Sequence, residues 1–463
     1  MLIYERELEV PVLLGHKGLL SYFAAEVGKR LGRDEVPVRF AVTETSPAGY
    51  RCEIGVMSGV GDAPILKPPS IFELRRRLGE NPDSFNVVLL VPTGVGAEIG
   101  GHAGDAGPVT RLLGAVCDRL ITHPNVVNAS DINELPENGL YVEGSVISRF
   151  LQGTAGLQRV RSNRVLFVAD EHESSWFTEA AINSLNAARA TYGLDCPRIV
   201  RLDPPVKLTA EYSSSGRAVG RVEDLQNLTR ALRPYLGQFD ALALASVIQV
   251  PRNYHMDYFT SGGEMVNPWG GVEAIYTHAV SMLYDVPSAH SPMLEDEDVL
   301  DMDAGIVDPR MAAEAISSTF LQCIFKGLQR APRIVTGAAM GTPGVLTAAD
   351  VACLVIPDGC VGLPVLSALE QGIPVIAVRE NRNLMQNDTA ALPWAPGQYC
   401  VVENYLEAAG ALCAMKAGIT AASVRRPLLG APVDVVHNGL ALVQPEKAQE
   451  EGRERVAAGN HRP

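Results

Sequence analysis

The sequence lacks three features that would each assign it to a familiar class of protein. Its 463 residues contain no apolar run near the ~18 residues that a membrane-spanning helix needs. Its eight cysteines are dispersed, with no C-x-x-C pair, which excludes a zinc ribbon and argues against a disulfide framework. Cations are few, because 39 Lys and Arg stand against 53 Asp and Glu, a formal charge of −14. This balance argues against binding to nucleic acid or to an anionic membrane.

The N-terminal residues, MLIYERELEV, are charged from position 5 and have no apolar stretch, so we expect no signal peptide. Together with dispersed cysteines, this predicts a cytoplasmic protein with no membrane partner. With 47% hydrophobic residues the chain can bury a sizeable core, and its length suggests two or three domains. Residues 444–463 are polar and lack a periodic apolar face, and we expect them to form a disordered tail.

The hydrophobic pattern predicts an α/β fold in two parts. Residues 1–82 resemble a small α+β domain with a helix over 19–31 and a short basic helix over 71–78. In residues 83–443, continuous apolar runs alternate with amphipathic helices, which is typical of a doubly wound, mainly parallel sheet. Two helical runs, 271–283 and 309–328, form a helical insertion at about 271–330. The strands of the second part are predicted at 86–91, 118–122, 164–169, 198–202, 241–247, 352–356 and 374–378.

In such a sheet the ligand crevice lies beyond the carboxyl ends of the strands, so the loops there are the candidate site. The loop 91–110 holds six glycines between Thr93 and Val109 and enters a helix at a Gly-Pro pair. Its amides could hold a carboxylate or phosphate. It has neither the Gly-Lys-Ser/Thr of a Walker loop nor the third glycine of a dinucleotide loop, and residues 79–110 contain no Lys or Arg. A tight structural turn and a subunit interface are the alternatives. The candidate ligand contacts are Thr93, Gly100, Gly101, His102 and Asp105.

Two further loops carry polar residues directly after predicted strands. His123, Asn125 and Asn128 follow the strand 118–122, where a neutral imidazole could shuttle a proton and the amides could orient a carboxylate. Asn residues are also ordinary turn formers. The segment ADEHESSW at 169–176 could offer oxygen and imidazole ligands to a divalent metal, although acidic residues before a helix commonly act as caps.

The loop 246–271 is rich in rings, amides and charges and closes on glycines, which favours a binding loop or lid. Arg252 is the candidate fork for a substrate carboxylate, with Asn253 and Asp257 as further contacts. His255 is a candidate proton-transfer group.

In the strand–turn–helix–strand unit 354–383, Asp358 and Cys360 stand in the turn. A cysteine at a helix N-terminus can have a lowered pKa and act as a thiolate, but a free cysteine is as often a small buried apolar group. Glu380 and Asn381 follow the next strand and complete the candidate contacts.

Two resemblances follow from these motifs. The stretch from about 86 to 388, with PTGVGAEIGGHAGDA, THPNVVNASDIN and IPVIAVREN, resembles a bacterial and plastid-lineage family of unknown function, which implies no activity. The unit PDGCVGLPVLSALEQGIPVIAV, within 354–378, is similar to the second cysteine region of the aspartate/glutamate racemase and maleate isomerase superfamily. That resemblance implies that Cys360 is a thiol acid/base or nucleophile. The superfamily uses two opposed cysteines and this chain has no second one suitably placed, so His102, His123 or His255 would have to replace it.

The sequence therefore predicts an enzyme that acts on a small, polar, carboxylate-bearing metabolite by proton abstraction, as an isomerase, racemase or lyase. His123, His255 and Cys360 would be its catalytic residues. The alternatives are a transferase with a nucleotide or phosphorylated donor, and a metabolite-binding or scaffold protein without catalysis. The sequence requires no cofactor and leaves room for a divalent metal. A homo-oligomer is expected, because chains of this kind commonly assemble.

Overall fold

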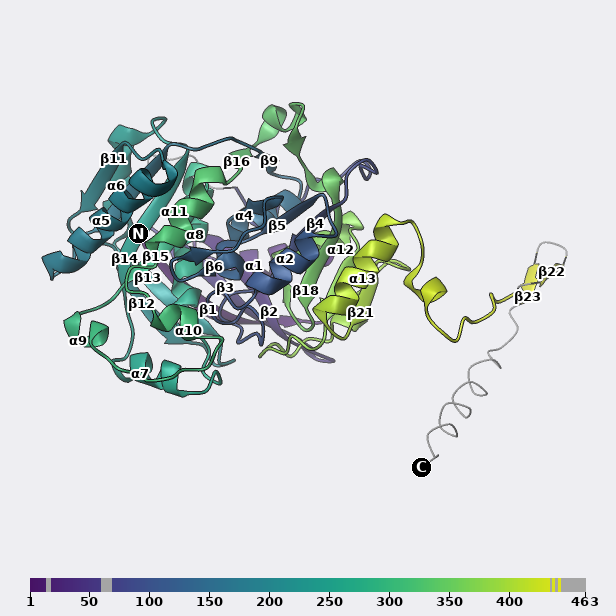
Figure 1. Ribbon diagram of the computed structural model, residues 1–463. Coiled ribbons are helices and arrows are strands. Elements are labelled where there is room, and N and C mark those ends of the chain that lie inside the picture. Colours follow the sequence, from purple (N-terminus) through teal and green to yellow (C-terminus); the bar gives the residue numbers. More distant parts are fainter. Residues whose placement is uncertain (14–17, 60–68, 434, 438–439, 443–463) are drawn as a thin grey trace. The chain divides into compact units, whose positions relative to one another are not determined.

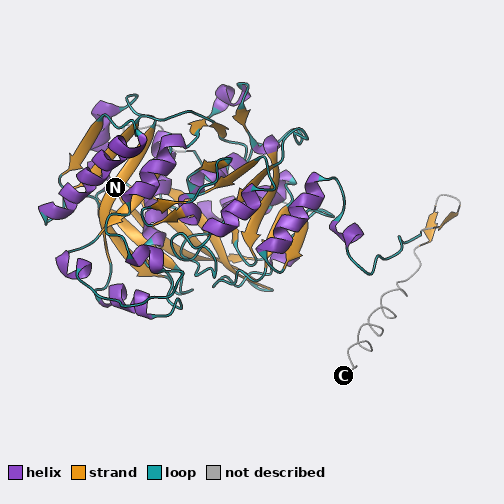
Figure 2. Ribbon diagram, viewed as in Figure 1, coloured by secondary structure: helices purple, strands orange, loops and turns teal. Residues whose placement is uncertain are grey.

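A computed structural model describes residues 1–13, 18–59, 69–433, 435–437 and 440–442 (Figure 1). Residues 1–413 form one compact unit and residues 414–463 a second. The first unit is mixed α/β, with one large curled sheet, a smaller sheet and several helices (Figure 2). In the second unit β22 (Val435–His437) and β23 (Leu440–Leu442) pair antiparallel. The tail predicted at 444–463 lies outside the described residues.

The large sheet has ten strands in the part of the chain that is described. Its order is β11 (Arg198–Leu202), β10 (Val165–Asp170), β14 (Ala241–Gln249), β12 (Lys207–Tyr212), β13 (Ala218–Glu223), β1 (Leu2–Pro11), β3 (Gly49–Ser58), β2 (Glu35–Ser46) and β19 (Val361–Gly362), with β15 (Ser288–Met293) paired to β14. From β11 to β12, and between β14 and β15, neighbours are parallel. From β12 to β19 they are antiparallel.

The smaller sheet has six described strands, in the order β21 (Tyr399–Val402), β20 (Val375–Val378), β18 (Val351–Pro357), β4 (Asn86–Leu89), β5 (Arg119–Thr122) and β8 (Gly139–Tyr141). Every neighbouring pair is parallel. β4, β18 and β20 are buried along their whole length. Their continuous apolar sequences follow from this burial on both faces. All six carboxyl ends lie at one edge of the sheet.

Helices complete the unit. Those that bear on the site are α4 (Gly144–Leu151), α7 (Asn253–Thr260), α8 (Gly270–Tyr284), α9 (Glu297–Leu300), α10 (Ala312–Ala315), α11 (Leu321–Arg330) and α12 (Leu363–Gln371). The others are α1 (Leu19–Gly28), α2 (Gly107–Gly114), α3 (Pro124–Val127), α5 (Ser175–Tyr192), α6 (Leu225–Leu232) and α13 (Tyr405–Lys416), which ends in the second unit. Short strand pairs are made by β6 (Asn128–Ala129) and β7 (Ile132–Asn133), and by β9 (Gly156–Gln158), β16 (Arg333–Val335) and β17 (Val345–Leu346). None of the described helices is both long and apolar enough to cross a membrane.

The α/β class is confirmed, but the predicted strands do not form one sheet. β10, β11 and β14 belong to the ten-stranded sheet, whereas β4, β5, β18 and β20 form the smaller one. A buried strand has the same apolar sequence in either sheet, so its pattern does not reveal its neighbour. The boundary predicted at residue 82 falls inside the compact unit, because β1 pairs with β13 and β2 pairs with β19.

Two predicted helices were wrong. Residues 71–78 are not helical; instead Arg76 and Arg77 donate to backbone carbonyls at the carboxyl end of α12. The run 309–328 is divided into α10 and α11, with Phe320 in the left-handed region at φ 49°. Asp131 accepts hydrogen bonds from Thr319 and from the amide of Gln322, and this contact holds the break between the helices.

Helix α8 packs against β2, β13, β15 and α4, and is buried on most of its faces. Close approach to β13 depends on two glycines. A Cβ at Gly271 would lie 2.2 Å from the Ala218 carbonyl oxygen, and one at Gly220 would lie 2.5 Å from Val272 Cβ. α8 is therefore fixed against the large sheet by contacts that only glycine permits.

We predict opposite effects for two Gly→Ala substitutions in helices. Gly271→Ala should lower the free energy of unfolding by about 1–3 kcal/mol, because the new methyl group forces α8 away from β13. Gly410→Ala in α13, where a Cβ meets nothing within 4 Å, should raise it by about 0.5–1 kcal/mol. Urea unfolding of both variants measures the difference. Equal stability of the two variants would contradict the packing described here.

Candidate functional site

A cavity of about 610 Å³ lies between the carboxyl edge of the six-stranded sheet and helix α8. Thr93, His123, Glu143 and Cys360 line it from the loops that follow β4, β5, β8 and β18. On the opposite side α8 contributes a polar stripe, Glu273, Thr277 and His278. Loops from distant parts of the sequence therefore meet at one cavity, as the sequence predicted for His123 and Cys360.

Unsatisfied polar atoms gather around this cavity. Thirteen described residues have buried side-chain nitrogen or oxygen atoms without a hydrogen-bond partner, and seven of these residues line the cavity. They are His123, Ser130, Arg149, Gln152, Arg217, His255 and His290. Because buried polar atoms are normally hydrogen-bonded, this concentration indicates a space that holds water or a polar ligand.

The central contact of the site joins Glu143 to His278. Glu143 caps the N-terminus of α4, where its Oε2 accepts the Ser145 amide at 3.0 Å and the Val146 amide at 3.3 Å. Its Oε1 meets Nδ1 of His278, which comes from α8. Burial alone would raise the pKa of Glu143, but the charge and hydrogen bond of His278 and the Ser145 bonds hold this pKa below its usual range. The carboxylate is therefore ionised beneath the imidazole.

The His278 ring lies across the start of α4. A Cβ at Gly144 would be 3.1 Å from His278 Cε1 and 3.7 Å from its Nε2. His278 lines the cavity from α8, and 16% of its side chain is exposed.

His123 lies at the same edge of the sheet. Burial lowers the pKa of His123 to about 4, and the hydrogen bond to Val91 and the nearby Glu143 only partly oppose this. The imidazole is therefore neutral at physiological pH, and its Nε2 is buried without a partner.

A second imidazole–carboxylate pair is built on the same helix. Nδ1 of His290, from β15, lies 2.9 Å from Oε1 of Glu273 on α8, and Nε2 of His290 is buried without a partner. Helix α8 therefore contributes the carboxylate to one pair and the imidazole to the other.

Glu314, on α10, closes another part of the cavity wall. Its Oε1 accepts the Ala103 amide at 2.7 Å and the Tyr258 hydroxyl at 3.0 Å, and its Oε2 accepts the Asn267 amide at 3.2 Å. Nδ1 of His102 lies 2.8 Å from the same hydroxyl. Burial raises the pKa of Glu314 to about 7.

Three arginines border the cavity. Arg217 is fully buried against Glu53, and Nη1 of Arg39 lies 3.2 Å from Oε1 of Glu5. Burial lowers the pKa of Arg39 to about 10, which leaves it charged. Arg149, on α4, lies 2.7 Å from Asp285, while its Nε has no hydrogen-bond partner.

Six predicted residues line the cavity: Thr93, His123, Asn125, Asn128, His255 and Cys360. Of the two alternatives for Cys360, its position fits the small buried group, because the residue is buried in the core. Burial raises the pKa of this thiol far above its usual range. Cys360 is also separated from α12 by β19, which pairs with β2, so it does not sit at the helix N-terminus.

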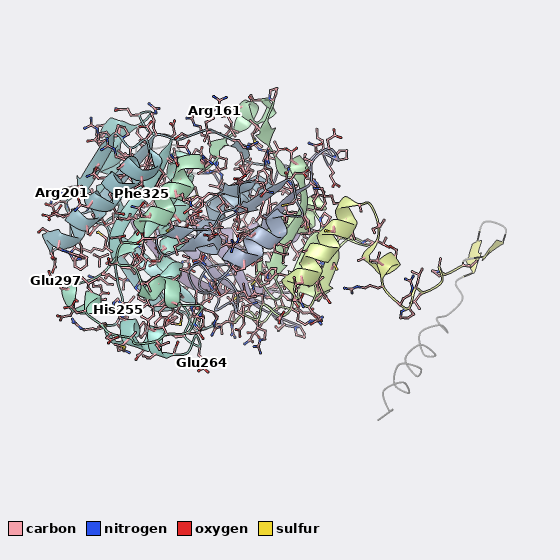
Figure 3. All side chains as sticks on the ribbon, viewed as in Figure 1. Arg161, Arg201, His255, Glu264, Glu297 and Phe325 are labelled. Carbon is pink, nitrogen blue, oxygen red and sulfur yellow. The ribbon has the colours of Figure 1, made fainter. Side chains whose placement is uncertain are left out.

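The substrate-clamp role predicted for Arg252 does not fit its position. The segment forms helix α7, whose inner side carries His255 (labelled in Figure 3), Met256 and Phe259. Arg252 is exposed and pairs with Asp298 at 2.7 Å. Asn253 and Asp257 are also exposed, and bond to each other at 2.7 Å.

The other predicted contacts lie outside the cavity lining in the described chain. The Gly100 amide donates to Asp105 Oδ1 at 2.7 Å, and Asn381 exchanges two 2.9 Å hydrogen bonds with the Ile99 backbone. The glycine loop is thus held by protein groups where ligand contacts were expected. The predicted contacts outside the lining also include Gly101, His102, Asp358 and Glu380. A Cβ at Gly101 would strike the Ala97 carbonyl. The Asp358 carboxylate accepts a hydrogen bond from the Gly359 amide, and Glu380 is exposed.

The proposed metal ligands at 169–176 have other partners. The Asp170 carboxylate accepts the Val206 amide at 3.1 Å, Glu171 pairs with Arg201, and His172 Nε2 lies 3.0 Å from the Leu294 carbonyl. Within the described ranges no group of three His, Cys, Asp or Glu side chains is arranged to hold a metal.

Sequence reasoning missed His278, His290, Glu273 and Arg149. Glu143 was not among the predicted site residues either. The available signal was in α8, where Glu273, Thr277 and His278 interrupt an otherwise apolar helix at the spacing of one face. Polar residues on a buried helix need partners, and such partners mark a site.

The geometry defines a mixed α/β protein with a cavity at the edge of a parallel sheet, lined by both polar and apolar side chains. The family model described as "Protein of unknown function (DUF3326)" matches residues 86–425, and the chain belongs to this family, as the resemblance predicted. An "uncharacterized lipoprotein" of Synechococcus sp. (strain ATCC 27144) is 35% identical over 346 residues, 74% of this chain and 93% of that protein. No solved structure matches. The local resemblance to the racemase superfamily stays a prediction.

Cysteine labelling tests the thiol environments. At pH 8, iodoacetamide should modify the exposed Cys400 and Cys413 rapidly and leave Cys360 unmodified in the folded protein, because its buried thiol stays protonated. Mass spectrometry of proteolytic fragments measures each site, with urea-unfolded protein as the control in which Cys360 does react. Labelling of Cys360 at the rate of Cys400 would restore the thiolate hypothesis.

Glu314 should make stability depend on pH. Its folded pKa of about 7 exceeds the ordinary 4.5, so its stabilising contribution is complete below pH 4.5 and is lost as the pH rises through 7. The unfolding free energy of wild type, relative to Glu314→Gln, should therefore fall across this window by up to about 1.4 kcal/mol per pH unit. Urea titrations from pH 4.5 to 8 measure the difference, with Glu264→Gln, at an exposed position (Figure 3), as the control. A difference independent of pH would contradict the assignment.

Proposed function

We propose that this protein is an enzyme that abstracts a proton from a carboxylate-bearing metabolite, with isomerase, racemase or lyase chemistry. The observation that carries the proposal is the Glu143–His278 pair facing the same cavity as the neutral, unpartnered His123. Buried imidazoles with one ring nitrogen oriented by a carboxylate are the usual general bases of enzymes.

The strand order supports this location. We interpret the six-stranded sheet as the doubly wound part of the fold, because the chain extends from β4 to β5 and β8 on one side and through β18, β20 and β21 on the other. Ligands of such sheets bind where the order reverses, beyond the strand ends. The loops after β4 and β18, which carry Thr93 and Cys360, both line the cavity.

His278 is the proposed base. Its Nδ1 proton, donated to ionised Glu143, leaves the Nε2 lone pair for the substrate. His123, with a pKa of about 4, is too weak a base for this step. Its role is to orient the substrate through Nε2. Arg149 is the proposed partner of the substrate carboxylate, because its buried Nε is unpartnered and Ser145 and Ser148 line the cavity from the same helix.

Racemases and many isomerases need a second acid/base group on the opposite side of the reacting carbon. His290, oriented by Glu273, is our candidate, and it takes the place of the thiol that the racemase resemblance assigned to Cys360. A one-base elimination would need only His278, so the lyase alternative remains open.

We keep a cytoplasmic location and a homo-oligomeric state as proposals. The name of the Synechococcus relative is a competing indication for location. Cell fractionation and light scattering decide these two points.

Deuterium exchange tests the catalytic proposal without a known substrate. We expect wild-type protein in D2O to introduce deuterium into at least one acid from a panel, at C2 of 2-hydroxy and 2-amino acids or at C3 of 2-oxo acids, as read by NMR. Glu143→Gln and His278→Gln should each slow this exchange by about 10²–10⁴-fold. His278→Gln removes the proposed base, and Glu143→Gln removes the carboxylate that orients it. Arg252→Ala, exposed and outside the cavity lining, is the matched control for Arg149→Ala.

Binding of a panel acid without exchange, or exchange that survives His278→Gln, would overturn the assignment. The first outcome would favour the non-catalytic metabolite-binding alternative.

A further inference from the structure

The cavity is too large for a small metabolite alone. Liquid water occupies about 30 Å³ per molecule, so 610 Å³ corresponds to roughly 20 non-hydrogen atoms of ligand. A four-carbon dicarboxylate has about eight such atoms and would fill less than half of this space. Pockets of this size generally bind ligands of drug-like dimensions.

The lining changes character away from Glu143 and His278. The opposite wall comes from α7, β15 and the segment 294–320, which we call the strap. Its lining side chains are mostly apolar: Met256, Phe259, Met293, Leu294, Val299, Leu300, Met302, Ile316 and Phe320. The Glu314 carboxylate in this wall is already bonded to Ala103, Tyr258 and Asn267. His255 and His290 also belong to this wall, each with an unpartnered Nε2, so a polar ligand would find few partners only along the apolar lining residues between Met293 and Met302.

Two features suit this wall to a flexible apolar chain. Five of the eleven methionines of the protein line the cavity. Met256, Met293 and Met302 lie in this wall, and Met282 and Met385 line other parts of the cavity. Methionine is the side chain that adapts best to ligands of variable shape. Ile316 lines the cavity and is also 79% exposed, so apolar surface continues from the cavity to the solvent along the strap.

We propose that the ligand is an amphiphilic acid, with its carboxylate and reacting carbon at Arg149 and His278 and an unbranched apolar tail along the strap. The inference rests on the proposed function for the position of the head group. The head group takes about five of the roughly 20 non-hydrogen atoms, so the atom count limits the tail to about 15 carbons inside the cavity. Longer tails extend past Ile316 into solvent.

A homologous series of 2-hydroxy monocarboxylic acids, from 4 to 20 carbons, tests this by isothermal titration calorimetry on the full chain. Burial of each methylene contributes about 0.8 kcal/mol, so Kd should fall about four-fold per carbon and level off near about 17 carbons. A dicarboxylate of equal length should bind at least ten-fold more weakly, because its second charge would enter the apolar wall.

Two strap variants localise the effect. Met302→Gln, in the lining, should reduce the dependence of Kd on chain length, whereas Ile306→Gln, fully exposed and outside the lining, should leave it unchanged. A Kd independent of chain length, or tighter binding of short dicarboxylates, would overturn the proposal.

The two proposals fail separately. Deuterium exchange into short acids with no chain-length dependence would retain the catalytic function and reject the amphiphilic ligand. Chain-length-dependent binding without exchange would retain the amphiphilic ligand and reject the catalytic role of His278.

Discussion

The burial of helix α8 against the large sheet and α4 is the constraint on which the site depends. Gly220 and Gly271 allow this helix to approach β13 at backbone distance, which fixes its rotation as well as its position. Glu273 and His278 can then reach partners in β15 and at the start of α4. Since one partner lies on β15 of the large sheet and the other at the start of α4, a displacement of α8 would separate both pairs together.

Several strands were predictable because burial on both faces leaves a continuous apolar sequence. The predicted strands 86–91, 118–122, 352–356 and 374–378 lie within one or two residues of β4, β5, β18 and β20. Their partners were not predictable, since pairing depends on the packing of complete surfaces and leaves no mark in a single strand. The prediction of one helix over 309–328 failed for a related reason, because a contact with Asp131 ends α10 before Phe320.

The site residues fall into the same two groups, those that a strand pattern reveals and those whose place depends on tertiary packing. His123 and Cys360 could be located because each follows a buried strand, and parallel strands present their carboxyl ends at one edge. His278 could not, because its partner Glu143 lies 135 residues away in sequence and the contact depends on how α8 packs against α4. Arg252 shows the opposite error, since a polar residue in a supposed loop turned out to lie on the outer face of α7.

Four charged side chains buried around β13, β1, β3 and β2 of the large sheet determine where the chain can be truncated. Arg217 stands just before β13, Glu5 on β1, Glu53 on β3 and Arg39 on β2, so four successive strands each supply one member of a buried set with no net charge. The family match begins only at residue 86. A truncation to the matched region would remove both carboxylates that lie against buried Arg217, and loss of one partner from a buried pair typically costs about 3–5 kcal/mol. The preceding strands are thus an electrostatic complement of the matched region, not an appendage to it.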